Sequence, residues 1–196
     1  MKIVVINHLS LDGVMQSPGG PEEDRRGGFK HGGWAQPDND QALGEAMGQR
    51  MGQSGSLLLG RFTYEAFHAY WPKQKNNPYT DVLNRTQKYV ASRKLEEPLP
   101  WSNSTLLRGD AGEAVSKLKQ QPGKDLVVLG SGDLIQTLMR RDLIDEYLIM
   151  IHPRVLGSGR RLFTEESSFA DLDLVDCKPT PKGVLLASYR PKRSPR

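Results

Sequence analysis

The sequence predicts an α/β protein with a mixed, mostly parallel sheet, helices on both faces and an antiparallel hairpin at its C-terminal end. Apolar runs of strand length alternate with helix-length segments along most of the chain. The clearest unit covers residues 125–159, where an apolar run at 126–129, a Gly130-Ser131-Gly132 turn, a one-sided apolar helix pattern and a second apolar run at 147–151 form a βαβ motif. The last two apolar runs flank a proline- and glycine-containing turn, which is typical of a hairpin.

The other elements follow from short apolar runs and from their turn residues. In chain order, the expected strands cover residues 2–9, 56–59, 88–91, 104–107, 126–129, 147–151, 172–177 and 184–190. The expected helices run from a cap at Asp38 or Asn39 to about residue 51, and then over residues 60–70, 78–86, 111–120 and from 134 onward. Residues 14–37 are rich in glycine and lack periodicity, and so long a loop in a compact domain is usually functional or mobile.

Length and composition fit one domain, which we place at residues 1–190, followed by a basic, disordered tail at 191–196. The single cysteine, Cys177, excludes a disulfide framework and a thiolate-rich zinc site. We expect a cytoplasmic protein, because no apolar run could cross a bilayer and the first residues are too polar for a signal peptide. The net charge of +4 suits phosphorylated small molecules and does not by itself argue for nucleic acid.

Three polar or cationic segments follow strands of the predicted sheet, at residues 60–63, 92–94 and 130–132. The carboxyl ends of parallel strands form the ligand-binding edge of such sheets. Glycines that open a helix also let an anion approach its first N–H groups. A nucleotide pyrophosphate is the expected ligand of Gly130-Ser131-Gly132, although the third glycine of the dinucleotide fingerprint is absent and a simple tight turn is the alternative.

An ordered set of motifs resembles the dihydrofolate reductase-like superfamily, and within it the reductase (C-terminal) domain of the riboflavin-biosynthesis deaminase-reductase. The set comprises Ser-Leu-Asp-Gly at 10–13, Leu-Gly-Arg-Phe-Thr-Tyr-Glu at 59–65, Val-Ala-Ser-Arg at 90–93, Val-Leu-Gly-Ser-Gly at 128–132, Asp-Glu-Tyr-Leu at 145–148 and the segment 153–163. The resemblance spans nearly the whole chain. It implies a dihydrofolate reductase-like three-layer fold, NADPH as hydride donor, a homodimer and a heterocyclic, ribosylamino-pyrimidine or pterin-type substrate.

The same resemblance assigns cofactor contacts residue by residue. It implies that Ser92, Arg93 and Lys94 receive the adenosine 2′-phosphate, and a guanidinium matches a phosphate in a bidentate manner. A solvated charge at a strand end is the alternative for Arg93. The residues implied to border the adenosine and its phosphates are Gly60, Arg61 and Thr63, and those implied to hold the pyrophosphate and reach the nicotinamide are Gly130, Ser131, Gly132, Asp133 and Leu134.

Two departures from the family pattern bear on the site. Ser131 stands where the superfamily often has a second glycine and an unusual cis peptide, so the 130–131 peptide is either trans or a strained cis bond. The chain also lacks the His-x-Glu and Pro-Cys-x-x-Cys motif of a zinc deaminase, which excludes the bifunctional enzyme. The Gly-Arg-Phe-Thr-Tyr-Glu run is closer to the folate-reductase pattern, so the substrate stays open.

Hydride transfer to an imine or carbonyl needs a proton source and a shaped pocket. Asp12 is our first candidate acid, with a raised pKa expected from partial desolvation; the alternative is a turn aspartate before Gly13. Asp40 is a second candidate carboxylate, with an exposed helix-start residue as the favoured alternative. Trp34 is expected to wall the pocket unless it is simply a packed aromatic, and Asn7 is a further candidate substrate contact.

Other classes of chemistry receive little support from the residues. The histidines His8, His31, His68 and His152 show no metal-ligand spacing, so no metal is expected. No nucleophile elbow or Ser-His-Asp order is present. A non-catalytic nucleotide-binding or assembly protein on the same scaffold is the main alternative function. Nucleic-acid binding through the basic tail is disfavoured, because no aromatic residues are interleaved with its charges.

Overall fold

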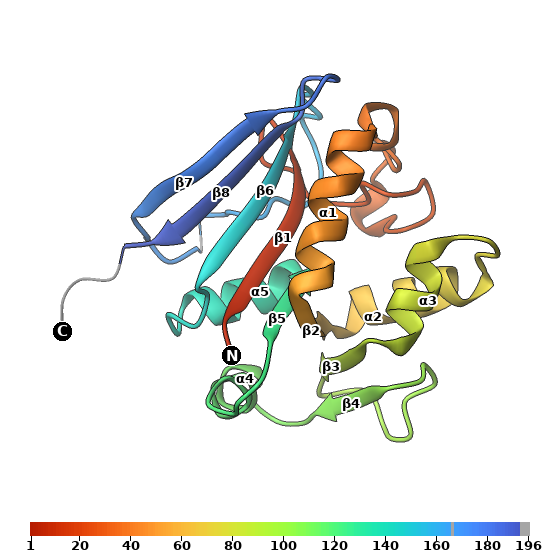
Figure 1. Ribbon diagram of the computed structural model, residues 1–196, viewed down its shortest axis with the longest axis vertical. Coiled ribbons are helices and arrows are strands. Elements are labelled where there is room, and N and C mark those ends of the chain that lie inside the picture. Colours follow the sequence, from red (N-terminus) through yellow and green to blue (C-terminus); the bar gives the residue numbers. More distant parts are fainter. Residues whose placement is uncertain (166, 193–196) are drawn as a thin grey trace.

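A computed structural model describes residues 1–165 and 167–192 and shows one eight-stranded sheet with helices on both faces (Figure 1). The sheet order is β4-β3-β2-β5-β1-β6-β8-β7. All pairings up to β6 are parallel, whereas β8 is antiparallel to both β6 and β7. The strands are β1 Ile3–Ser10, β2 Ser54–Gly60, β3 Gln87–Ala91, β4 Ser104–Leu107, β5 Asp125–Leu129, β6 Glu146–His152, β7 Leu172–Pro179 and β8 Leu185–Pro191. The predicted α/β class, parallel sheet and terminal hairpin are confirmed.

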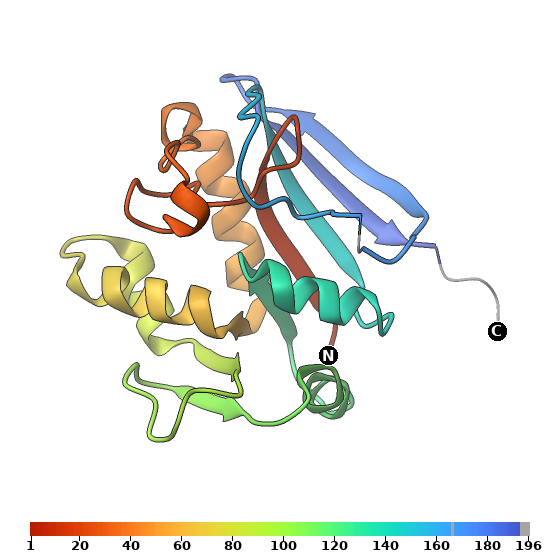
Figure 2. The same ribbon diagram turned by 180° about the vertical axis from the view of Figure 1, so that it is seen from behind.

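Helices occupy both faces of the sheet. Helix α1 crosses one face, and α4 and α5 lie on the other, as the two opposite views show (Figures 1 and 2). The helices are α1 Gln41–Gln53, α2 Arg61–Tyr70, α3 Pro78–Arg85, α4 Ala111–Lys119 and α5 Gly132–Met139, with 3-10 turns at Arg26–Gly28, Gln36–Asp38 and Trp71–Lys73. In the βαβ unit β5-α5-β6, the central strand β1 separates β5 from β6.

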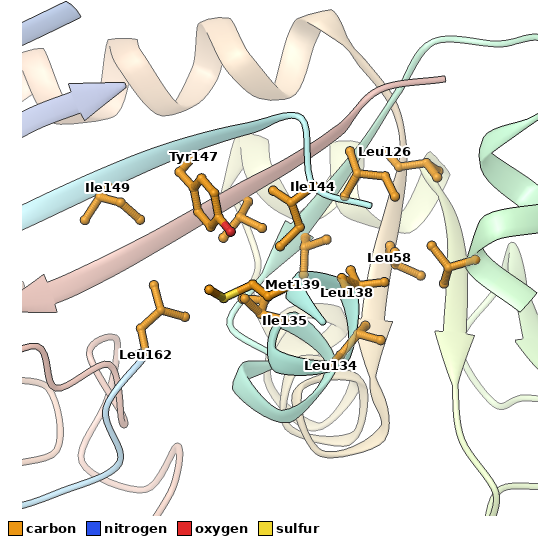
Figure 3. Close-up of a cluster of buried hydrophobic side chains, with 14 of the residues drawn as sticks. Leu58, Leu126, Leu134, Ile135, Leu138, Met139, Ile144, Tyr147, Ile149 and Leu162 are labelled. Atoms are coloured by element: carbon orange, nitrogen blue, oxygen red, sulfur yellow. The ribbon is translucent and has the colours of Figure 1, made fainter. Parts of the chain in front are cut away.

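Alternation along β1 divides the core between the two faces. Ile3, Val5 and Leu9 point into the cluster beneath α4 and α5, whereas Val4 and Ile6 point into the cluster that includes α1. Both sets are nearly fully buried, as expected for the central strand of a sheet covered on both sides. Figure 3 shows the first cluster, in which the apolar side of α5 faces the sheet. This packing fixes the position at which α5 begins, and therefore the glycine turn before it.

Two predicted boundaries are wrong. The N-cap of α1 is Asp40, whose side chain accepts a hydrogen bond from the Leu43 N–H at 2.9 Å, and not Asp38 or Asn39. Asp38 ends the preceding 3-10 turn and is buried. Residues 191 and 192 do not belong to a disordered tail, because Pro191 is the last residue of β8 and the Lys192 N–H donates to the Asp171 carbonyl at 2.8 Å. The rest of the predicted tail, 193–196, lies outside the described residues.

The glycine-rich segment at 14–37 is held by its own polar contacts. The Trp34 indole N–H donates to the Gln16 carbonyl at 2.7 Å, and the Gln16 side-chain amide donates to the carbonyls of Asp24 and Arg26. The guanidinium of Arg26 lies 3.6 Å from the ring centre of Phe62 in α2. The segment therefore bridges from β1 to α2 along the edge where the strands end.

Candidate active site

A large cavity of roughly 2200 Å³ follows the carboxyl ends of β1, β2, β3 and β5. Its walls come from these strand ends, from α1, α2 and α5, and from the segment after β1. One half is polar and cationic and includes the turns after β2, β3 and β5. The other half is apolar and is formed largely by Ile6, Leu43, Met47, Phe67 and Met150. We refer to these as the cationic half and the apolar half.

In the cationic half, the turn after β5 is tied to the turn after β2. The Ser131 N–H donates to Thr63 Oγ1 at 3.0 Å, and the Gly60 N–H donates to Ser131 Oγ at 3.0 Å. The Ser131 hydroxyl in turn donates to the Leu129 carbonyl at 2.9 Å. Ser131 thus joins two parallel strands just where α5 begins. The serine that departs from the glycine pattern has a structural role that glycine could not perform.

The two glycines of this turn differ in backbone conformation. Gly130 and Ser131 have positive φ values of 55° and 56°, whereas Gly132 does not. A Cβ at Gly130 would lie 3.1 Å from Thr63 Oγ1, and a Cβ at Gly132 would meet mainly the flexible end of Met15, at 3.0 Å. Gly130 is therefore the position whose backbone conformation favours glycine, and Gly132 has no such requirement. The Gly130–Ser131 peptide is trans.

Several arginines surround these turns. Arg93 follows β3, is exposed and lines the cavity, and Arg140 and Arg141 reach it from the end of α5. Arg141 pairs with Asp110 at 2.9 Å. Arg160, from the segment after β6, forms an ion pair with Asp133 at the start of α5. Guanidinium groups beside glycine-containing turns form a surface suited to phosphate groups.

The structure brings most of the sequence-predicted site residues to this one cavity. Three do not line it: Asp12, Trp34 and Lys94. The candidates that do line it are Asn7, Asp40, Gly60, Arg61, Thr63, Ser92, Arg93, Gly130, Ser131, Gly132, Asp133 and Leu134. Of these, Arg61 is paired with Glu65 at 2.8 Å, and the Asn7 amide donates to the Gly130 carbonyl at 3.3 Å.

Asp12 is engaged in a loop and not in the cavity. Its carboxylate accepts hydrogen bonds from the Ser10 hydroxyl at 2.6 Å and from the N–H groups of Leu156 and Gly157 at 3.1 and 2.9 Å. These bonds, with that of Ser10 the strongest, lower the pKa of Asp12 to about 2. The expected rise in its pKa is wrong, because the hydrogen bonds donated to the charged carboxylate outweigh its partial desolvation.

The other two candidates take positions closer to the alternatives we weighed. Asp40 caps α1, and its second oxygen accepts from the Lys182 N–H at 3.2 Å; the Leu43 bond and these contacts lower its pKa. Trp34 is buried with Val14, Phe29 and Ala35, and its ring meets His152 edge-on at 5.2 Å between centres. Trp34 supports the cavity wall from behind and does not form it.

The sequence analysis missed a polar chain that leads into the apolar half. His8 Nδ1 lies 2.8 Å from His152 Nε2, and His152 Nδ1 lies 3.0 Å from Asp38 Oδ2. Arg154 binds both oxygens of Asp38, at 2.9 and 2.7 Å. His8 lines the cavity, whereas His152 is completely buried. A histidine near the carboxyl end of each of two apolar strands was the available signal, but we had considered histidines only as metal ligands.

In the polar chain from Arg154 to His8, only Arg154 and Asp38 carry a charge. The Arg154 hydrogen bonds hold the pKa of Asp38 below its usual range, so Asp38 is ionised. Burial lowers the pKa of His152, and burial together with the neighbouring His152 lowers the pKa of His8 to about 3. Both imidazoles are therefore neutral near pH 7. The described residues contain no cluster of three or more histidine, cysteine or acidic side chains suited to a metal ion.

Comparison with known proteins agrees with this architecture. The sequence profile of the RibD C-terminal domain matches residues 1–186. The chain belongs to the RibD C-terminal domain family. Two relatives are proteins of Bacillus subtilis (strain 168): YyaP is 28% identical over 196 residues, covering 96% of this chain and 94% of YyaP, and YwjB is 30% identical over 135 residues, covering 69% and 73%.

Solved structures share the fold of this RibD C-terminal domain protein. A putative riboflavin biosynthesis protein from Shewanella sp. PV-4 superposes with a TM-score of 0.73 at 24% identity, covering 98% of this chain and all of that one. Dihydrofolate reductase from Enterococcus faecalis, complexed with NADP(H), superposes with a TM-score of 0.62 at 12% identity, covering 98% and 97%. The chain thus has a RibD-like reductase scaffold with a dihydrofolate reductase-like fold. No helix in the described part of the chain is long and apolar enough to cross a membrane.

Proposed function

We propose that this protein is an NADPH-dependent reductase that transfers a hydride to a small heterocycle of the ribosylamino-pyrimidine or pterin type. The observation that carries the proposal is the juxtaposition, in one cavity, of a cationic half built on two joined glycine turns and an apolar half beside the central strand. A phosphorylated cofactor suits the first half, and a flat, weakly polar ring suits the second.

The residues of the cationic half fit the phosphates of NADPH. The positive φ of Gly130 and its closeness to Thr63 favour glycine at this position. Because glycine has no side chain, a phosphate could approach the backbone of the turn there. We assign Gly60, Arg61, Thr63 and residues 130–134 to the adenosine, pyrophosphate and nicotinamide side, and Ser92 and Arg93 to the 2′-phosphate. Lys94, which lies outside the cavity wall, is the weakest member of this set. When bound, NADPH would supply the hydride.

The two halves of the cavity offer different groups to a ligand, which suits a reductase that binds a phosphorylated cofactor beside a ring-shaped substrate. Arg93 interacts electrostatically with Asp110, which pairs with Arg141, but forms no ion pair of its own among the described residues, so its guanidinium can bind a phosphate. The apolar half offers Met47 and Phe67 for stacking and contact with a ring. Adjacent placement of two ligands would give the proximity that hydride transfer needs.

The test is a substrate screen that follows NADPH absorbance with ribosylamino-pyrimidines, pterins and quinones, together with calorimetric NADPH and NADH titrations. We expect NADPH to bind more tightly than NADH and one heterocycle class to be reduced. NADPH binding with no turnover of any compound would favour the alternative, a non-catalytic nucleotide-binding or assembly protein. No NADPH binding would refute both.

A homodimer and a cytoplasmic location also remain part of the proposal. The RibD C-terminal domain resemblance motivates the dimer, and sedimentation of the full chain at several concentrations would test it. A monomer over the whole range would remove it. The cytoplasmic location is likewise a proposal, and fractionation of cells that express the tagged chain would test it.

A further inference from the structure

Resting on the proposed function, we propose that His8 is the polar recognition group of the apolar half and that its Nε2 accepts a hydrogen bond from an N–H or O–H group of the substrate. The carrying observation is the chain Arg154–Asp38–His152–His8, which runs from a buried ion pair to the cavity wall. His152, Asp38 and Arg154 are positioning residues, because none of them lines the cavity.

The direction of each hydrogen bond in the chain follows from its inner end. An ionised carboxylate can only accept, so Asp38 requires the proton of His152 to be on Nδ1. A neutral imidazole carries one N–H, which leaves His152 Nε2 as an acceptor. Across the 2.8 Å contact, His8 Nδ1 must then donate. His8 Nε2 is left with its lone pair and without a proton.

That lone pair is the part of His8 available to a ligand. Nδ1 is bound to His152, whereas Nε2 has no hydrogen-bond partner in the described part of the chain, and the half-buried His8 ring lines the cavity. His8 stands opposite Met150 in the β1–β6 pairing and on the same strand face as Ile6, so its neighbours are apolar. An acceptor in apolar surroundings favours a ligand with a matching donor and disfavours one without it.

The substrate class is thereby narrowed. Pyrimidine and pterin rings with an unsubstituted ring N–H or amino group can donate to His8 Nε2, whereas unsubstituted quinones and rings in which every N–H is alkylated cannot. The charged groups that line the cavity from the start of α1 and from the segment after β1 are Asp40, Glu22, Glu23, Asp24 and Arg26. None of these is within hydrogen-bond distance of His8.

Nitrogen NMR of protein labelled at its four histidines tests the tautomer without substrate or NADPH. Ring-nitrogen shifts should show His8 and His152 protonated on Nδ1 only, with His8 neutral from about pH 5.5 to 8. Assignment uses His8→Gln, and His31→Gln serves as the matched control because His31 is exposed and outside the cavity wall. A proton on His8 Nε2, or titration of His8 near its ordinary pKa of about 6.5, would overturn the proposal.

Binding is tested in the same samples with isocytosine, which has ring N–H and amino donors, and with its fully N-methylated derivative. Isocytosine should shift the His8 Nε2 resonance and the methylated compound should not. His8→Leu should weaken isocytosine binding about tenfold, while His8→Gln, which keeps an acceptor, and His31→Gln should retain it. An unshifted Nε2, absent binding, or undiminished affinity in His8→Leu would contradict the assignment. NADPH titration of these samples separates the outcomes, since loss of NADPH binding refutes the proposed reductase and leaves the His8 results unaffected.

Discussion

The two halves of the cavity are built in different ways. The cationic half consists of short turns at strand ends; within each turn the residues are sequence neighbours, and hydrogen bonds such as Ser131–Thr63 join one turn to the next. The apolar half depends on a polar chain whose members come from β1, the 3-10 turn before α1, and β6 with the segment after it. The His152–Asp38 contact spans 114 positions. Short turns that each have a local sequence signal form the cationic half, whereas contacts between distant segments without such a signal support the apolar half.

The largest expected effect is a loss of stability when the Arg154–Asp38–His152–His8 chain is broken. Asp38→Ala removes the counter-charge of Arg154 and the acceptor of the fully buried His152, and breaking such a network should lower the free energy of unfolding by about 3 kcal/mol. Urea unfolding near pH 7 measures it. The matched control is Asp81→Ala on the exposed side of α3, which should change stability by about 0.5 kcal/mol or less.

The pH dependence of the stability difference between the parent and Asp38→Ala gives a second test. Because the folded-state pKa of Asp38 is lowered, its stabilising contribution is present above the ordinary aspartate pKa and is lost as the pH falls through the folded value. The difference between the parent and Asp38→Ala should therefore shrink in acid. A loss below about 1 kcal/mol near pH 7 would mean that the chain contributes little to the fold.

The next effect belongs to the cationic half. Arg93→Ala should weaken NADPH binding by about tenfold or more and leave NADH binding nearly unchanged, because only NADPH has a 2′-phosphate for a charge-assisted bond. Calorimetric titration of both cofactors measures it. Arg108→Ala removes an equally exposed charge two residues before Asp110 and outside the cavity wall, and should change neither affinity. An equal loss for both cofactors would take Arg93 out of this role.

The sequence predicted the residues of the cationic half better than the polar chain beside the apolar half. Gly130-Ser131-Gly132, Gly60 and Arg93 were found because a glycine or arginine just after an apolar run has a local meaning. The strands and helices were found for the same reason, within a few residues. His8 and His152 gave no such signal, since nothing in the intervening sequence shows that their rings meet or that Asp38 completes the chain. The pKa of Asp12 is lowered first by the nearby Ser10 hydroxyl and then by N–H groups that are distant in sequence, those of residues 156 and 157.

A smaller effect is expected at the glycine turn, where it distinguishes Gly130 from Gly132. Gly130→Ala places a Cβ against Thr63 in a backbone with φ of 55°, and should reduce stability by about 1–2 kcal/mol. Gly132→Ala has no positive φ to oppose and meets only the end of Met15, so it should cost less. Thermal or urea unfolding of the two variants measures the difference. Equal stability in the two would contradict the asymmetry of the turn.

The smallest effect on stability is expected at Asp12, which follows β1. Asp12→Asn keeps one acceptor for the N–H groups of Leu156 and Gly157 and loses the charge, so it should cost about 1 kcal/mol of stability. Because the folded pKa of Asp12 is about 2, that difference should persist down to about pH 4 and disappear as the pH falls through 2.

Catalysis completes the comparison between Asp12 and His8. Removal of a general acid would slow hydride transfer by about 10²–10⁴-fold. Asp12 lies outside the cavity wall and holds the 156–157 backbone, so single-turnover NADPH oxidation by Asp12→Asn should stay within about threefold of the parent. His8→Leu, measured with the same substrate, should instead raise KM about tenfold. A hundredfold slower Asp12→Asn would reverse this assignment and make Asp12 the proton donor that its position after β1 first suggested.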